Sequence, residues 1–173
     1  MLCGVNEYSL ELARRGDAAR LAVMSNELVE YGFRPSWSAS RISCHIRHPD
    51  SLVLCTRDAE GTIVGFAIMR YARDTAHLNL LAVDPAHRRR GVARRLIRWL
   101  EETAFTAGTF IIGLELRATN EGAFAFYQSI GYRELDRVEG YYQGLETAIR
   151  MTRDLRAGSG AVPGTTESPP EPI

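Results

Sequence analysis

The amino-acid sequence predicts a mixed α/β domain built on one sheet with helices packed against it. Apolar residues recur every three or four positions in several stretches, which is typical of amphipathic helices. Short apolar runs bounded by turn residues lie between these stretches and predict strands. A length of 173 residues with 45% hydrophobic side chains suits a single domain with an ordinary core.

The predicted elements follow the order helix, helix, three strands, helix, strand, helix, two strands. Asp17, Ser38 and Asn120 are candidate caps for three of the helices, because their short polar side chains accept from free backbone N–H groups. Gly131 ends the last helix as a left-handed cap. The predicted ranges are 18–29, 38–46, 51–57, 62–72, 77–83, 91–104, 110–118, 120–130, 132–135 and 148–151.

The chain divides into a domain of residues 1–156 and a tail of residues 157–173. The tail, AGSGAVPGTTESPPEPI, has almost no large apolar side chain, so we expect it to be disordered. Residues 1–26 hold no long apolar run, and no stretch approaches the roughly 18 apolar residues of a membrane span. We therefore expect neither a signal peptide nor a membrane partner.

The composition narrows the chemistry further. The formal net charge of zero argues against a general nucleic-acid binder. All 21 basic residues are arginine, so lysine Schiff-base chemistry is excluded. Cys3, Cys44 and Cys55 form no metal-binding spacing, and Cys44 and His45 are neighbours whose side chains diverge. These features predict a cytoplasmic protein without a metal, acting as a monomer or a weak dimer.

The segment AVDPAHRRRGVARRLIRWLE, residues 82–101, concentrates positive charge at one turn. Six arginines fall within residues 88–98, where a predicted strand has ended and a helix begins near Gly91. A helix N-terminus with a glycine offers free N–H groups to a phosphate, and Arg89 and Arg90 would add charge. The alternative is a solvated arginine face. The loop has neither a Walker motif nor a Rossmann G-x-G-x-x-G.

Residues 88–93, RRRGVA, resemble the Gln/Arg-x-x-Gly-x-Gly/Ala motif of the GNAT acetyltransferases, in which this loop holds the pyrophosphate of acetyl-CoA. HLNLLAVDPAHRRRGVARRLI, LELRATNEGAFAFYQSIGY and GYY follow in the order typical of N-terminal protein acetyltransferases, most similar to the bacterial ribosomal-protein alanine N-acetyltransferases of the RimI type. The resemblance covers roughly residues 65–151. It implies the GNAT fold, with a mixed, mostly antiparallel central sheet flanked by helices, and acetyl-CoA as co-substrate. The cofactor-binding residues that it implies are Leu81, Ala82, Val83, Arg88, Arg89, Arg90, Gly91, Val92, Ala93, Arg94 and Asn120.

Glu115 and Tyr127 are the candidate catalytic residues. Such a reaction joins an amine to a thioester carbonyl, and it needs a neutral amine and a protonated leaving sulfur. By resemblance, Glu115 in the strand LELRA matches the general base of the family, and Tyr127 on the following helix matches its general acid. The alternatives are an exposed strand face shared by Glu115 and Arg117, and core packing for Tyr127.

Trp37, Tyr141 and Tyr142 are the candidate substrate-binding residues. By resemblance, the tyrosine pair borders the acceptor channel and Trp37 lines its other side, while packing is the alternative for each. The pair favours a peptide acceptor, above all the N-terminal α-amine of a protein such as a ribosomal protein. The remaining alternatives are acetylation of a small amine (a polyamine, amino acid or drug) and a non-catalytic acyl-CoA-binding module.

Overall fold

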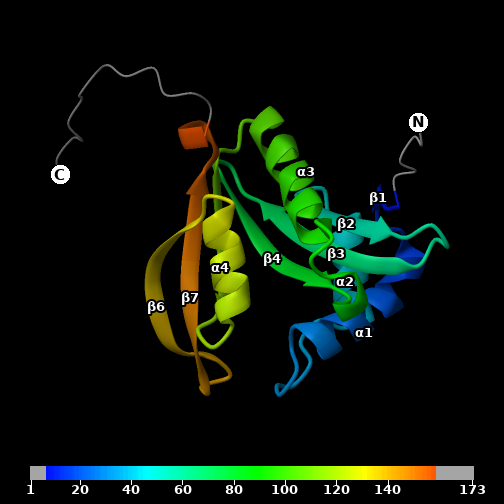
Figure 1. Ribbon diagram of the computed structural model, residues 1–173, viewed down its shortest axis with the longest axis horizontal. Coiled ribbons are helices and arrows are strands. Elements are labelled where there is room, and N and C mark those ends of the chain that lie inside the picture. The colour runs from blue at the N-terminus through cyan, green and yellow to red at the C-terminus, as the bar shows by residue number, and fades with distance from the viewer. Residues whose placement is uncertain (1–6, 159–173) are drawn as a thin grey trace.

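The computed structural model describes residues 7–158, which form one seven-stranded sheet with helices on both faces (Figure 1). The strand order is β1-β2-β3-β4-β5-β7-β6, and every neighbouring pair is antiparallel except β4 and β5. The elements are β1 (Ser9–Leu12), α1 (Ala18–Leu28), α2 (Ala39–Arg47), β2 (Ser51–Arg57), β3 (Ile63–Tyr71), β4 (Thr75–Val83), α3 (Val92–Thr106), β5 (Ile111–Arg117), α4 (Glu121–Ser129), β6 (Arg133–Tyr142) and β7 (Glu146–Asp154). Short 3₁₀ turns occupy residues 15–17, 85–87 and 155–158.

The sheet separates two apolar cores. One core packs α3 and α4 against the sheet around buried side chains such as Leu96 and Tyr127. The other packs α1 and α2 against the opposite face around Leu21 and Ile42. This division confirms the predicted α/β class, in which helices cover both faces of a mixed, mostly antiparallel sheet.

The predicted order of elements was wrong at its start, because β1 precedes the first helix. Ser9–Leu12 adds an antiparallel edge strand to β2, with Ser9 opposite Arg57. The closing strands β6 and β7 also run well beyond the predicted segments. Beyond residue 158, the predicted tail lies outside the described residues. In the part of the chain that the structure describes, no helix is long and apolar enough to cross a membrane.

Two of the predicted caps act as predicted. The Ser38 hydroxyl accepts from the backbone N–H of Arg41, at 3.2 Å, and the Asn120 Oδ1 accepts from that of Ala123, at 3.0 Å. Asp17 occupies the N-cap position of α1, but its carboxylate makes no cap hydrogen bond and instead accepts from Arg57 at 2.8 Å. The Ser38 and Asn120 contacts pair free N–H groups at the starts of α2 and α4, whereas the Asp17 contact ties the start of α1 to β2.

The parallel strands β4 and β5 pair over only part of their length. Their register runs from Thr75 opposite Ile111 to Leu78 opposite Leu114, although both strands continue beyond it. A β-bulge at Asn79 coincides with the end of this parallel pairing. On the antiparallel partner β3, Met69 lies opposite Leu78 and the adjacent Ile68 lies opposite Leu80, so Asn79 has no partner on β3. Leu78 packs into the α3 core and Leu80 into the α1 core, although alternate residues of a regular strand share one face. The bulge therefore opens the sheet between the two strands.

Candidate active site

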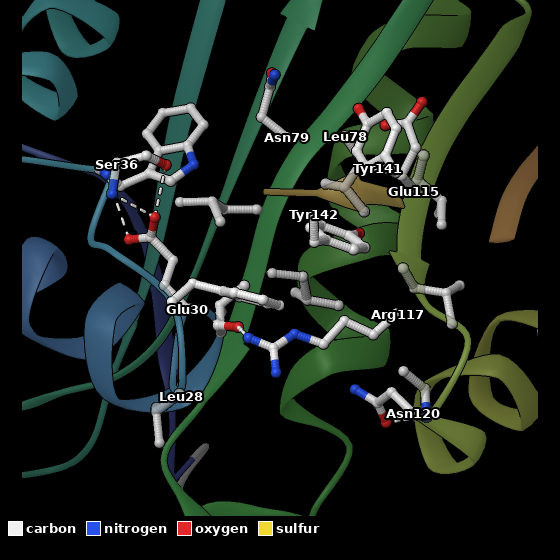
Figure 2. Close-up of a pocket in the computed structure, with 18 of the residues that line it drawn as sticks. Leu28, Glu30, Ser36, Leu78, Asn79, Glu115, Arg117, Asn120, Tyr141 and Tyr142 are labelled. Carbon is white, nitrogen blue, oxygen red and sulfur yellow. Dashed lines mark hydrogen bonds between the residues drawn. The ribbon is translucent and has the colours of Figure 1, made fainter. Parts of the chain in front are cut away.

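A cavity of about 340 Å³ lies where β4 and β5 separate (Figure 2). Its walls come from the α1–α2 connection, from both strands, from α4 and from the β6–β7 hairpin. We name it the acceptor cavity after the predicted acceptor channel, because seven of the predicted site residues line it: Trp37, Leu81, Glu115, Asn120, Tyr127, Tyr141 and Tyr142. Residues from these five segments are thus brought together at one place.

Glu115 extends from β5 into the wall of the acceptor cavity. Its side chain is 18% exposed, and its Oε2 lies 2.5 Å from Nε2 of His77 on β4. Figure 2 shows Glu115 and Tyr141 on one side of the cavity, with Glu30 and Ser36 on the other. The nearby negative charge of Glu115 adds to the effect of burial in raising the pKa of Tyr141. A partly buried carboxylate of this kind can accept a proton from a group inside the cavity.

Tyr127 projects from α4 and lines the same cavity. Its ring lies edge-to-face against Phe126 and Tyr132, with centroids 5.2 and 5.5 Å apart, and only 7% of the residue is exposed. Burial raises the pKa of its phenol well above the ordinary value, so the hydroxyl keeps its proton at neutral pH. That state is the one a proton donor requires. Tyr127 therefore packs in the core and also lines the cavity.

A buried carboxylate shapes the α1–α2 connection. Glu30 accepts from both the backbone N–H and the hydroxyl of Ser36, at 2.6 Å each, and from the backbone N–H of Trp37 at 3.3 Å. Trp37 is 8% exposed and belongs to the α1 core, while the guanidinium of Arg41 lies 4.0 Å from its ring. Trp37 thus has both of the roles considered for it, because it packs in the core and also lines the cavity.

Arg117 fastens the same connection to β5. It donates to the carbonyl oxygens of Val29 and Tyr31, at 3.0 and 2.6 Å. Its guanidinium lies 4.0 Å from the ring of Phe33 and forms an ion pair with Glu146 at 3.8 Å. Arg117 is 8% exposed, so Glu115 and Arg117 do not form the exposed strand face considered as an alternative.

Contacts between the α1–α2 connection and the β6–β7 hairpin border the cavity. Phe33 stacks on Tyr142 with centroids 5.9 Å apart. The amide of Gln143 binds the backbone of Arg34 in both directions, accepting from its N–H at 3.3 Å and donating to its carbonyl at 3.0 Å. These contacts join the two loops beside the cavity.

A second cavity, of about 530 Å³, lies between the start of α3 and α4. Gly91 precedes the helix with a left-handed φ of 79°, and no side chain caps this end. The N–H groups of the first turn are therefore available to an anion. The lining residues include several arginines and no carboxylate, which fits the pyrophosphate of a coenzyme A. They are Val83, His87, Arg88, Arg89, Gly91, Val92, Ala93, Arg94, Gly122, Ala125, Phe126 and Ser129.

The predicted cofactor-binding residues do not all meet at this phosphate cavity. The Arg90 guanidinium donates to Glu7 at 3.0 Å, so that it points toward the segment before β1. Ala82 is buried in the core beneath α1 and α2. Leu81 and Asn120 line the acceptor cavity instead. The residues that do line the phosphate cavity are Val83, Arg88, Arg89, Gly91, Val92, Ala93 and Arg94.

Sequence reasoning missed three side chains that shape the site. His77 was not among the predicted site residues, yet it contacts Glu115. Glu30 and Arg117 received no role, because their partners are backbone atoms of a connection whose path no periodicity reveals. Cys44 and His45 do not meet, since the His45 ring binds Ser51 at 2.8 Å. A cysteine nucleophile therefore receives no support.

The profile of the acetyltransferase (GNAT) family matches residues 19–132, and the chain belongs to this family. The [ribosomal protein bS18]-alanine N-acetyltransferase of Salmonella typhimurium is 40% identical over 96 residues, which span 54% of this chain but only 65% of that protein. The N-alpha-acetyltransferase RimI of Mycobacterium tuberculosis is 33% identical over 146 residues, 81% of this chain and 88% of that protein. The crystal structure of the ribosomal-protein-S18-alanine N-acetyltransferase from Escherichia coli superposes with a TM-score of 0.75 at 26% identity, covering 86% of this chain and 94% of that one. These similarities confirm the GNAT fold and the resemblance to RimI-type proteins.

Proposed function

We propose that this chain is an acetyl-CoA-dependent N-acetyltransferase that modifies the N-terminal α-amine of a protein. The observation that carries the proposal is a carboxylate and a protonated phenol, Glu115 and Tyr127, lining one cavity beside a second cavity suited to pyrophosphate. Relatives named for acetylation of a ribosomal-protein alanine support a ribosomal-protein N-terminus as the acceptor.

Each catalytic residue has one task in this proposal. Acetyl-CoA, when bound, supplies an acetyl thioester. Glu115 accepts a proton from the α-ammonium group, so that the neutral nitrogen can attack the carbonyl carbon. Tyr127 donates its proton to the departing sulfur. Leu81, Ala82 and Val83 lie on the stretch of β4 that β5 no longer pairs, and we assign the acetyl group and the pantetheine arm to their backbone.

The two arginines Arg89 and Arg94 hold the pyrophosphate in this assignment, together with the free N–H groups at the start of α3. Their guanidinium groups and these N–H groups provide charge-assisted hydrogen bonds at a site without competing carboxylates. Arg90 serves a different purpose, because its ion pair with Glu7 ties the loop to the segment before β1.

The acceptor cavity favours a peptide over a polyamine. Tyr31 and Tyr141 line it and are 56% and 48% exposed, so they form an aromatic rim on which an extended peptide can lie. Among the described lining residues, Glu30 and Glu115 are the acidic ones, and both oxygens of Glu30 already accept hydrogen bonds. One available carboxylate suits one α-amine, whereas a polyamine carries several positive charges.

The test is acetyl transfer from acetyl-CoA to short peptides that begin with Ala, Ser or Met, beside spermidine and free amino acids. We expect the peptides to be acetylated on the α-amine, and the same peptides with a blocked α-amine to remain unmodified. Transfer only to a small amine would replace the proposed acceptor. If no amine is acetylated, the proposed acetyltransferase function is refuted.

A further inference from the structure

His77 and Glu115 form a close pair between the parallel strands β4 and β5. The two residues are not opposite one another, since His77 is in register with Gly113. Gly113 and Glu115 share one face of β5, because they are two residues apart. The imidazole of His77 nevertheless reaches the carboxylate of Glu115, with Nε2 and Oε2 2.5 Å apart.

His77 is the hydrogen-bond partner that orients Glu115. Within residues 7–158, the side chain of Glu115 forms no other hydrogen bond. Arg150 stands opposite it on β7 but is occupied by a bidentate contact to Asp136. Other polar groups near the pair include Tyr141 and Tyr142 on β6, Asn79 on β4, and Arg70, which is opposite His77 on β3.

The pair lies between the acceptor cavity and a solvent-exposed recess on the other side. Glu115 lines the acceptor cavity with a side chain that is 18% exposed. His77 instead lines a separate recess of about 210 Å³, beside Arg70, Tyr71 and Asn79, and its side chain is 42% exposed. A proton that reaches Glu115 from the cavity can therefore leave through the imidazole on the other side.

The proposed reaction requires such an exit. When the α-ammonium group is acetylated, a C–N bond forms and the C–S bond breaks. Of the three ammonium protons, the amide keeps one and the coenzyme A thiol gains one, by way of Tyr127. The third proton has to reach solvent. Imidazole has two ring nitrogens, so it can accept a proton at one and release a proton from the other.

We propose that His77 is a positioning residue that also relays this proton: it aims the Glu115 carboxylate into the acceptor cavity and passes the proton from the carboxylate to solvent. In the Nδ1–H tautomer of His77, Nε2 takes up the proton from Glu115 and Nδ1 gives one to water in the recess. The resulting Nε2–H donates to the ionised carboxylate and aims it, and proton exchange with water at the half-exposed ring then restores the first tautomer. This role rests on the proposed acetyltransferase function.

The kinetic test compares two variants with one control. His77→Ala removes both the hydrogen bond and the relay, and we expect kcat to fall about tenfold or more while KM for acetyl-CoA stays within twofold. Added imidazole should restore much of the lost rate, which replacement of a purely structural side chain would not allow. His77→Gln keeps an amide able to donate to Glu115 but cannot relay a proton, so it should be impaired without responding as strongly to imidazole. His48→Ala, at an exposed histidine outside both cavities, is the control.

A wild-type rate in His77→Ala, or no rescue by imidazole, would overturn the relay. A second readout tests the pair without any turnover. The protein has four histidines, so their ring ¹⁵N resonances can be assigned individually. We expect Glu115→Gln to displace the Nε2 resonance of His77 and to leave that of His48 in place. An unmoved His77 resonance would refute the pairing, whereas an inactive wild-type protein would refute the proposed function instead.

Discussion

Replacing Tyr127 with phenylalanine separates a catalytic role from a packing role. The substitution removes one hydroxyl group and keeps the ring, whose contacts with Phe126 and Tyr132 account for its burial. Among the described residues, the hydroxyl has no hydrogen-bond partner. The variant therefore loses no hydrogen bond to a described residue, and the Tyr127 hydroxyl is not among the fully buried polar atoms that lack a partner, so we expect the free energy of unfolding to change by no more than about 1 kcal/mol.

The expected result is a stable but slow enzyme. The melting temperature should change by no more than a few degrees, because about 1 kcal/mol corresponds to about 2–4 °C in a domain of this size. Loss of a general acid should lower kcat by about 100-fold or more. The KM for acetyl-CoA should change little, since the pyrophosphate is assigned to the other cavity.

The assay measures thiol release from acetyl-CoA with a saturating peptide, alongside thermal unfolding. Tyr132→Phe is the matched control, because Tyr132 is equally buried and lines neither cavity. A kcat for Tyr127→Phe within twofold of the wild type would refute the proton donor. A large fall in melting temperature would show that the hydroxyl has a structural partner.

Two other predictions concern binding. Arg89→Ala together with Arg94→Ala should weaken coenzyme A binding at least about tenfold by calorimetry, since charge-assisted hydrogen bonds contribute about 1.5–3 kcal/mol each. The control Arg98→Ala, which removes an exposed partner of Glu102 on the same helix, should leave the affinity unchanged. Equal affinities of the double variant and the wild type would show that these arginines only form a solvated helix face. Arg117→Met should raise the peptide KM and lower the free energy of unfolding by about 2 kcal/mol or more, because two carbonyl oxygens of the α1–α2 connection lose their donor. Acetyl-CoA affinity should be unchanged in Arg117→Met, and an unaltered peptide KM would show that the connection needs no such support.

Local sequence signals predicted the elements that carry strong periodicity. Helix α3 has buried side chains at Leu96, Ile97, Leu100 and Ala104, and this stripe is visible in the sequence. Strand β1 has only four residues, with no fully buried side chain among them, so its identity depends on pairing with β2. Strand β6 is a largely exposed edge rich in charge, and its full length likewise follows from pairing rather than from pattern.

The candidate site was predictable where a motif marks it and not where the fold assembles it. The glycine and arginines at the start of α3 form a continuous motif, and most of them line one cavity. The pairing of His77 with Glu115 joins residues 38 positions apart, and it depends on a parallel register that the sequence does not display. The direction of Arg90 depends in the same way on Glu7, 83 positions earlier.

The most direct test of the proposed chemistry is the effect of Glu115→Gln on turnover and on acetyl-CoA affinity, measured on the same preparation with an Ala-initiated peptide. Glutamine keeps the shape of the side chain but cannot accept the proton. We predict that kcat falls by about 100-fold or more while the Kd for acetyl-CoA stays within twofold. Unchanged turnover would remove Glu115 from the mechanism and contradict the proposed use of the acceptor cavity.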